Sequence, residues 1–469
     1  MKKKSSPSIA SRGGSYALMI SALAIALAIG VNLLFSALPG SLTKYDISAS
    51  KLYSVTGNTK AVVSRLDSDV TVYWIVQADQ EDDVLENLLE KYESLSPHIQ
   101  VVKRNPDVYP TFASQYTEET PANNSLVVEC GEKSRYIPVS DIYVEKIDYS
   151  FSDSSAFDGE GAITSAIDYV TSQELPKVYA LEGHGEAQLP DDFLKLVEKE
   201  NLELENLSLL TVDEIPQDAD CLIIYSPESD LSSREAEMLS EYASSGGKLL
   251  VMAGPGKNEN LMNLNSLITD YGVMPDEGVV MEEDRNYYAF QYPYLLIPDL
   301  LSSDITNSLM EERYFPILPL CAGLRVSAAG ENVTTFLTTS DTAFSKTSGY
   351  SVEREEGDLD GPFALGVSID CGNGGQLVWI SSSGFLEDMY NAYSSGANQD
   401  LAMNALSSLI GQREALAIRS KSLNYNYLTI SESSAALLKA VMIGLFPLSY
   451  LGVGIAVVVV RRRRQNEAK

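Results

Sequence analysis

The sequence lacks the motifs of several common catalytic chemistries. It contains no G-x-x-x-x-G-K-[ST] string, the loop whose backbone amides wrap phosphates in many ATPases. It also contains no G-x-S-x-G string, and His98 and His184 are its only imidazole bases, so a Ser-His-Asp triad is not indicated. Any nucleotide hydrolysis linked to this chain must therefore come from another protein. We predict that the chain is not an enzyme and has no cofactor.

Cysteines are scarce and widely spaced. The four of them, Cys130, Cys221, Cys321 and Cys371, form no C-x-x-C motif, so neither a zinc site nor a redox site is indicated. Cys130 and Cys221 lie in apolar, strand-like runs, where a buried thiol is inert. We expect small buried residues, with disulfides as the alternative.

Positive charge is also scarce, with 34 Lys and Arg against 65 Asp and Glu. This balance disfavours nucleic acid as a partner, because phosphate binding depends on clustered cations. Ten of the 34 cations lie before residue 40 or after residue 434. Residues 40–434 therefore carry 24 cations against 64 carboxylates, a net charge of −40, which favours a soluble middle region.

Two long apolar segments flank this acidic middle. Residues 16–38 carry no charge and residues 435–460 carry only Lys439, and about 20 apolar residues suffice to cross a bilayer as a helix. A cleavable signal peptide is the alternative for the first segment, but its apolar region would be about 7 to 15 residues long. Basic tails at residues 1–15 and 461–469 predict, by the positive-inside rule, two cytoplasmic ends and an extracellular or periplasmic middle.

The region 45–148 predicts a small α/β domain. Ser54 or Thr56 can cap a helix over residues 58–66, and a β-branched run follows at 70–76. Apolar residues at helical spacing over 82–95 end at Pro97, and a second strand is expected at 99–102. This β-α-β order, which we interpret as thioredoxin-like, is followed by a predicted hairpin over 125–130 and 135–139.

Residues 157–415 predict a larger, doubly wound α/β domain, and 416–434 a tether to the second span. Helices are expected at 161–171, 191–199 and 400–410. Strands are expected at 177–181, 221–225, 248–252, 333–338, 364–369 and 375–381. Ser232 caps a helix with Glu235 at the capping-box position, and Gly246 and Gly247 end it. Alternating strands and helices predict a mainly parallel sheet covered on both faces.

The candidate binding site is the GHGE sequence at residues 183–186. Gly183 and Gly185 permit an unusual turn after a strand, where open α/β sheets bind ligands, so His184 and Glu186 could point into a crevice. The alternative is a structural turn in which His184 hydrogen-bonds the neighbouring loop. We predict no metal there, since only one histidine is present.

An acidic turn imitates half of a calcium loop. Glu356, Asp358, Asp360 and Gly361 match its first positions, but the twelfth position is Val367, where a bidentate Glu is needed. We therefore expect a solvated acidic turn.

Several short blocks between the two apolar segments occur in a familiar order. They are YDIS at 45–48, KLYS at 51–54, DVTVY at 69–73, ITSAI at 163–167, KVY at 177–179, GHGE at 183–186 and the α/β unit over 218–255. In this order the chain resembles the GldG family of gliding-motility-associated ABC transporter auxiliary proteins. That resemblance implies a non-catalytic extracytoplasmic accessory subunit, with a multi-span permease and a cytoplasmic ATPase as partners.

Residues 218–225 with Gly246 and Gly247 also resemble flavodoxin-like or glutamine-amidotransferase-like sheets, without the catalytic Cys-His pair of the latter. Two other functions stay open. One is a cell-surface hydrolase or carbohydrate-binding protein that uses residues 287–294, rich in tyrosine, as a stacking surface. The other is a purely structural envelope protein.

Overall fold

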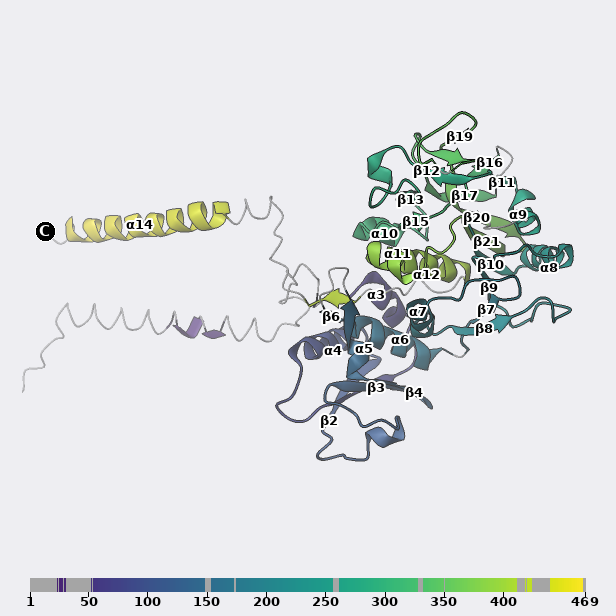
Figure 1. Ribbon diagram of the computed structural model, residues 1–469. Coiled ribbons are helices and arrows are strands. Elements are labelled where there is room, and N and C mark those ends of the chain that lie inside the picture. The colour runs from purple at the N-terminus through teal and green to yellow at the C-terminus, as the bar shows by residue number, and fades with distance from the viewer. Residues whose placement is uncertain are drawn as a thin grey trace, which may run out of the picture. The chain divides into compact units, whose positions relative to one another are not determined.

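The computed structural model describes residues 54–147, 153–172, 174–255, 261–327, 332–349, 351–410, 420–423 and 439–466, with a few isolated positions elsewhere (Figure 1). The chain divides into two compact units. Val55–Ser422 forms one, called the main unit here, and Met1–Ser54 with Leu423–Lys469 forms the other. The predicted mixed α/β class is confirmed, since helices alternate with strands in several sheets.

A four-stranded sheet, the smaller sheet, begins the main unit. Its order is β2-β1-β3-β4, from strands β1 (Val70–Ile75), β2 (Ile99–Arg104), β3 (Ser125–Cys130) and β4 (Lys133–Ile137). β1 and β2 are parallel and joined by helix α4 (Asp83–Leu95), whereas β3 and β4 form an antiparallel hairpin. The predicted β-α-β order and hairpin are confirmed. The interpretation of this part as thioredoxin-like stays a prediction.

Two side chains fix where the first helices begin. Thr56 caps helix α3 (Gly57–Ser64) by accepting the N–H of Thr59, as predicted. Asp82 caps α4 by accepting two backbone N–H groups. Helix α6 (Gly159–Thr171) contacts α3, α4 and the strands β3 and β4. It therefore packs on the smaller sheet, although its sequence follows the boundary that we predict near residue 148.

Residues 421–422, at the C-terminal end of the main unit, add a strand to one of its short sheets. Helix α5 (Val139–Ile142) leads into strands β5 (Tyr143–Ile147) and β6 (Asp153–Phe157), which pair as an antiparallel hairpin. β22 (Lys421–Ser422) pairs with β6 on its other edge. Residues 421–422, part of the predicted tether, are therefore bound to the main unit.

A ten-stranded sheet, the larger sheet, forms the rest of the main unit. Five strands are parallel, in the order β8 (Glu203–Leu207), β7 (Lys177–Leu181), β9 (Cys221–Tyr225), β10 (Lys248–Met252) and β21 (Gly375–Ile380). The others, all in antiparallel pairs, are β11 (Val273–Pro275), β14 (Asp299–Leu300), β16 (Leu324–Val326), β17 (Val333–Thr338) and β20 (Ala364–Gly372). The prediction of a mainly parallel sheet was thus wrong for half of it. β20 and β21 are joined by a tight turn, which only antiparallel neighbours can share.

Helices cover both faces of the larger sheet, as predicted. α7 (Asp191–Lys199) and α12 (Ala397–Ile410) pack on one core, whereas α8 (Ser233–Ser244) and α9 (Met262–Thr269) pack on the other. Within β7, Val178 joins the first core and Tyr179 the second, because successive side chains of a strand point to opposite faces. A flavodoxin-like or amidotransferase-like identity of this sheet stays a prediction.

Short elements are inserted between β11 and β20. The strands are β12 (Val279–Met281), β13 (Leu295–Leu296), β15 (Leu318–Pro319), β18 (Phe344–Lys346) and β19 (Leu359–Asp360), and the helix is α10 (Asn307–Glu312). β12, β18 and β19 form one sheet, and β13 pairs with β15. After β21, helix α11 (Asp388–Tyr393) precedes α12.

One helix of the second unit is long and apolar enough to cross a membrane, judged by length and composition among the described residues. It runs over Val441–Val460, within the π-helical turn Ala440–Leu445 and helix α14 (Phe446–Asn466). These residues lie within the predicted span 435–460. The predicted first span, residues 16–38, lies outside the described residues except for a few positions.

Candidate functional site

The GHGE turn follows β7 at the carboxyl end of the parallel strands. Gly183 and Gly185 have φ of +128° and +74°, a region in which side chains are strained. A Cβ on Gly185 would lie 3.1 Å from the Cβ of Glu228, so close packing adds to the backbone requirement. The predicted unusual turn is confirmed.

His184 lies between two carboxylates. Its Nδ1 is 3.3 Å from Oε1 of Glu186, and its Nε2 is 3.1 Å from Oε2 of Glu235. All three side chains are buried, and His184 as a whole is 8% exposed. Both ring nitrogens therefore face carboxylate oxygens, so a nitrogen that carries a proton can donate it to one of them.

The backbone of the turn is also bound to its surroundings. The N–H of His184 donates to Oε2 of Glu186 at 2.7 Å. The His184 carbonyl accepts the N–H groups of Glu228 and Ser229, at 3.0 and 2.9 Å, from the loop after β9. The Ser229 hydroxyl donates to the same carbonyl at 3.1 Å. The turn thus ties the ends of two neighbouring strands together.

Glu235 serves the turn and helix α8 at once. Its Oε2 accepts the N–H of Ser232, while the Ser232 hydroxyl accepts the N–H of Glu235, so the predicted capping box is confirmed. Burial raises the pKa of this carboxyl, but the hydrogen bonds from Ser232 and the contact with His184 outweigh it and hold the pKa below its usual value. Glu235 is therefore a carboxylate at neutral pH.

The geometry of this cluster matches the alternative interpretation, a structural turn in which His184 hydrogen-bonds the neighbouring loop. His184 and Glu186 are brought together as predicted, but they face each other and Glu235 rather than a crevice. Glu235, 51 residues from His184, was missed as a partner. Its sequence signal was the capping box, which predicts a helix start and not a contact with another strand end. Ligand binding by Gly183, His184, Gly185 and Glu186 stays a prediction.

No group of three or more His, Cys, Asp or Glu residues could hold a metal ion within the described part of the chain. The four cysteines are free thiols, with Cys221 and Cys321 buried and the other two partly buried. Burial raises the pKa of all four, that of Cys321 to about 12, so the reactive thiolate is scarce at neutral pH.

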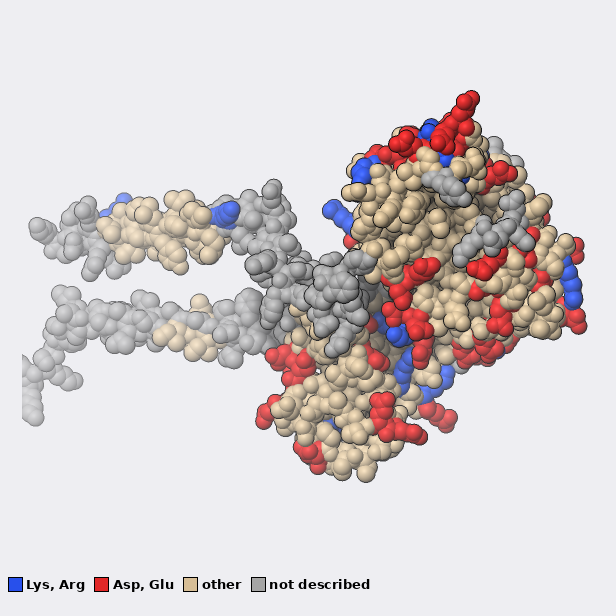
Figure 2. All heavy atoms as spheres, in the orientation of Figure 1, with Lys and Arg blue, Asp and Glu red and all other residues tan. Residues whose placement is uncertain are grey.

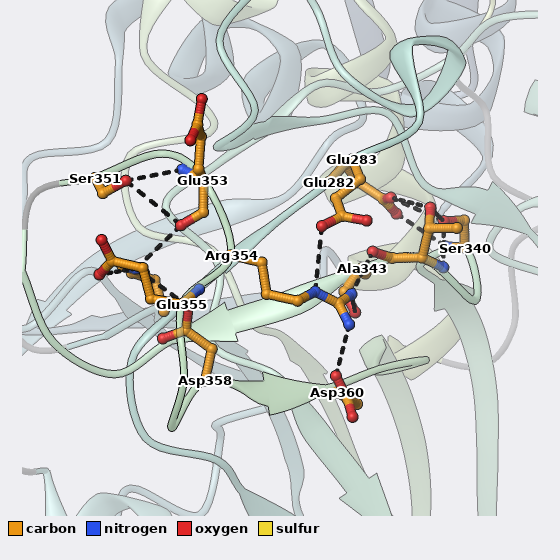
Figure 3. A network of polar contacts seen from close by, with 12 residues as sticks. Glu282, Glu283, Ser340, Ala343, Ser351, Glu353, Arg354, Glu355, Asp358 and Asp360 are labelled. Atoms are coloured by element: carbon orange, nitrogen blue, oxygen red, sulfur yellow. Dashed lines mark hydrogen bonds and ion pairs between the residues drawn. The ribbon is translucent and has the colours of Figure 1, made fainter.

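In the acidic turn, cations engage the carboxylates of Asp358 and Asp360 and that of the neighbouring Glu355, whereas Glu356 is exposed (Figure 3). Lys346, whose side chain is buried, lies 3.1 Å from Asp358 and 2.7 Å from Glu355. Arg354 lies 2.7 Å from Asp360 and 3.2 Å from Glu283. The turn therefore closes on basic residues of its own neighbourhood, as a structural loop does.

Part of the tyrosine-rich segment is exposed. Phe290 and Tyr292 are 49% and 51% exposed, and Phe290 lies 4.2 Å from the ring of Tyr393 on α11. Tyr292 lies 5.6 Å from Tyr294, measured between ring centroids. Phe290 has φ of +50°, an uncommon conformation for a bulky residue. Aromatic rings are thus presented outward at this loop.

Two segments of the chain match known protein families. Residues 175–361, which run from the start of β7 past the GHGE turn to β19, match a family described as an ABC-type uncharacterized transport system. The match supports an ABC transporter auxiliary family. Such a family suggests a non-catalytic role and a transport system with other components. Residues 49–144 match a second family, a domain of unknown function (DUF7088).

No curated protein matches the chain. The following solved structures are distantly similar to the chain. The mmIFT52 N-terminal domain has 20% identity, covers 52% of this chain and 99% of its own, and gives a TM-score of 0.38. PurLQS from Thermotoga maritima has 11% identity over 50% of this chain and all of its own, with a TM-score of 0.27. The exo-β-1,4-mannosidase Op5Man5 from Opitutaceae bacterium strain TAV5 has 10% identity over 68% and 47%, with a TM-score of 0.28. TM-scores this low establish neither fold nor function.

Proposed function

We propose that this chain is a non-catalytic, extracytoplasmic accessory subunit of an ABC-type transport system, similar to GldG. The observation that carries the proposal is the family match over 175–361, which spans the GHGE turn and much of the larger sheet. The buried histidine cluster and the engaged acidic turn agree with it, since neither offers a nucleophile beside a free base.

The location outside the cytoplasm is argued from charge. The helix over Val441–Val460 is followed directly by four arginines, and basic flanks mark cytoplasmic ends. Carboxylates are spread over the visible face of the main unit (Figure 2), as suits a soluble domain beside anionic lipid headgroups. With a second span at residues 16–38, the main unit would hang between two anchors.

Two anchors allow reciprocal coupling. A permease packed against either span could reorient the main unit when it moves, and an event at the main unit would bias the permease by the same free energy. The ATPase of the system would supply the energy from the cytoplasmic side.

Crosslinking in intact cells tests the proposal. The chain, tagged after Arg464, is crosslinked, purified by affinity and analysed by mass spectrometry. The control carries an unrelated apolar helix in place of residues 441–460. We expect an ABC permease and its ATPase to be enriched over the control. Recovery of neither would contradict the accessory role.

Carbohydrate binding is a second candidate, favoured by the outward rings of Phe290 and Tyr292. Calorimetric titration with chitohexaose and cellohexaose would show binding that Tyr292→Ala removes. Tyr109→Ala is the matched control, because Tyr109 is equally exposed but lies near the smaller sheet. Absence of binding, or loss in both variants, would count against this function.

A further inference from the structure

The two ends of the main unit meet at one buried carboxylate, that of Glu160 on α6. Thr56 lies at the start of the unit, directly before α3, and Lys421 lies at its end, in β22. β22 is held in place by pairing with β6, with Lys421 opposite Phe157. Segments at opposite ends of the unit thus reach the same side chain.

Glu160 is 2% exposed and contacts both ends directly. Its Oε1 accepts the N–H of Thr56 at 2.6 Å and the hydroxyl of Thr59 at 2.7 Å. Its Oε2 lies 2.7 Å from Nζ of Lys421, whose side chain is also largely buried. The Lys421 ammonium is the cation that neutralises this carboxylate in the described structure.

The surroundings of Glu160 exclude water and hold α3 in place. The Thr59 hydroxyl lies 3.0 Å from that of Thr164, and the Tyr92 hydroxyl donates to the Glu160 carbonyl at 3.0 Å. All of these groups are buried. Removing the ammonium would therefore leave a desolvated charge that neutral donors cannot compensate, which is costly.

The C-terminal strap, defined as Ile418 with residues 420–422, also reaches the larger sheet. Lys199, at the end of α7, lies 2.8 Å from Asp158 and 3.5 Å from the carbonyl of Ile418. The Ile418 side chain is buried. Since α6 packs on the smaller sheet and α7 on the larger one, the strap contacts helices of both.

We propose that Glu160 is a latch that couples the two chain ends of the main unit. Displacement of the strap withdraws Lys421, the unpaired carboxylate then destabilises its site, and Thr56 and the start of α3 loosen with it. A force that reaches Lys421 from the C-terminal helix would therefore loosen Thr56, at the end of the unit that leads to the N-terminal segment. The coupling itself does not depend on the proposed function, and only a role of this coupling in transport rests on it.

Hydrogen exchange of the full chain in detergent tests the latch through three variants. In Lys421→Met, we expect amide exchange of both residues 420–423 and residues 56–60 to rise by about tenfold or more. The control is Lys195→Met, which removes a lysine paired with Asp192 at the surface and should leave both segments unchanged. Unchanged exchange at 56–60 in Lys421→Met would overturn the proposal.

A double variant, Glu160→Gln with Lys421→Met, separates the latch from general loosening. The amide introduced by Glu160→Gln keeps an oxygen for Thr56 and Thr59 and leaves no unpaired charge, so protection of 56–60 should return while the strap stays fast in exchange. Equal exchange at 56–60 in the single and double variants would overturn the latch. The measurement needs no partner protein, so failure of the proposed transport role would not affect it.

Discussion

His184 illustrates how a residue that suggests chemistry can serve structure. Its imidazole lies between the carboxylates of Glu186 and Glu235, all three buried. In open α/β sheets this edge is where ligands bind. Here the side chains at the end of β7 are turned toward a neighbouring helix start instead.

Replacing His184 should destabilise the main unit. His184→Leu leaves two buried carboxylates without the imidazole that lies between them, and we expect the free energy of unfolding to fall by about 3 kcal/mol. His98→Leu is the control, because His98 contacts Asp69 at the surface and should cost less than about 1 kcal/mol. Chemical unfolding followed by tryptophan fluorescence measures both. Equal losses would contradict the structural role.

The carboxyl of Glu282 should make the free energy of unfolding depend on pH with the opposite sign to that of most carboxyls. Burial raises its pKa, although Ser340 donates an N–H and a hydroxyl to it. A raised folded-state pKa means that its contribution to stability is present below the unfolded-state pKa and is lost as pH rises through the folded-state pKa.

Glu282→Gln tests this sign. The variant keeps an acceptor for Ser340 and cannot ionise. The unsubstituted chain should lose the contribution of Glu282 as the pH rises, whereas the variant should not. The unfolding free energy of the variant minus that of the unsubstituted chain should therefore increase from about pH 4 to about pH 8. The measurement is the difference in unfolding free energy at the two pH values. A difference that does not change with pH would show that Glu282 does not titrate as its burial requires.

Some residue contacts were readable from the sequence and others were not. The capping box of Ser232 and Glu235 is local, so spacing alone found it. The contact of His184 with Glu235 and that of Glu160 with Lys421 depend on which strands become neighbours. No local pattern carries that information, and both contacts were missed.

At the scale of elements, the N-terminus of α8 offers a direct test of the capping box. Ser232→Ala removes the hydroxyl that accepts the N–H of Glu235, and we expect a loss of about 1 kcal/mol in unfolding free energy. Ser244→Ala, at the exposed last turn of the same helix, is the control and should have little effect. An equal effect of the two substitutions would rule out a stabilising cap.

Elements with a strong local signal were predicted closely. β7, β9 and β10 have the predicted bounds, because buried parallel strands are continuous apolar runs between polar turns. The antiparallel direction of β20 could not be predicted. An apolar run has the same sequence pattern whether its neighbouring strand is parallel or antiparallel. From the sequence, β22 is predicted to belong to a tether, because two polar residues carry no strand signal.

For the whole molecule, charge and hydropathy predict topology. The basic residues of the tails and the net charge of −40 over residues 40–434 predict that both ends lie inside and the middle outside. The two-span arrangement stays a prediction, since the described residues include one candidate helix.

Cysteine labelling in intact cells tests this topology. With Cys130 and Cys371 replaced by Ser, Glu119→Cys should react with a membrane-impermeant maleimide. Asn466→Cys should react only after the cells are permeabilised. Labelling of Asn466→Cys in intact cells would place the C-terminus outside and contradict the arrangement.

If the chain works as one subunit of a transport system, as we propose, it should co-purify with the other subunits. The most direct test of this proposal is purification of the tagged chain in a mild detergent, with the amounts of all co-purified proteins measured by quantitative mass spectrometry. We expect an ABC permease and an ATPase in fixed ratio to the chain. Recovery of the chain alone under these gentle conditions would contradict the proposal.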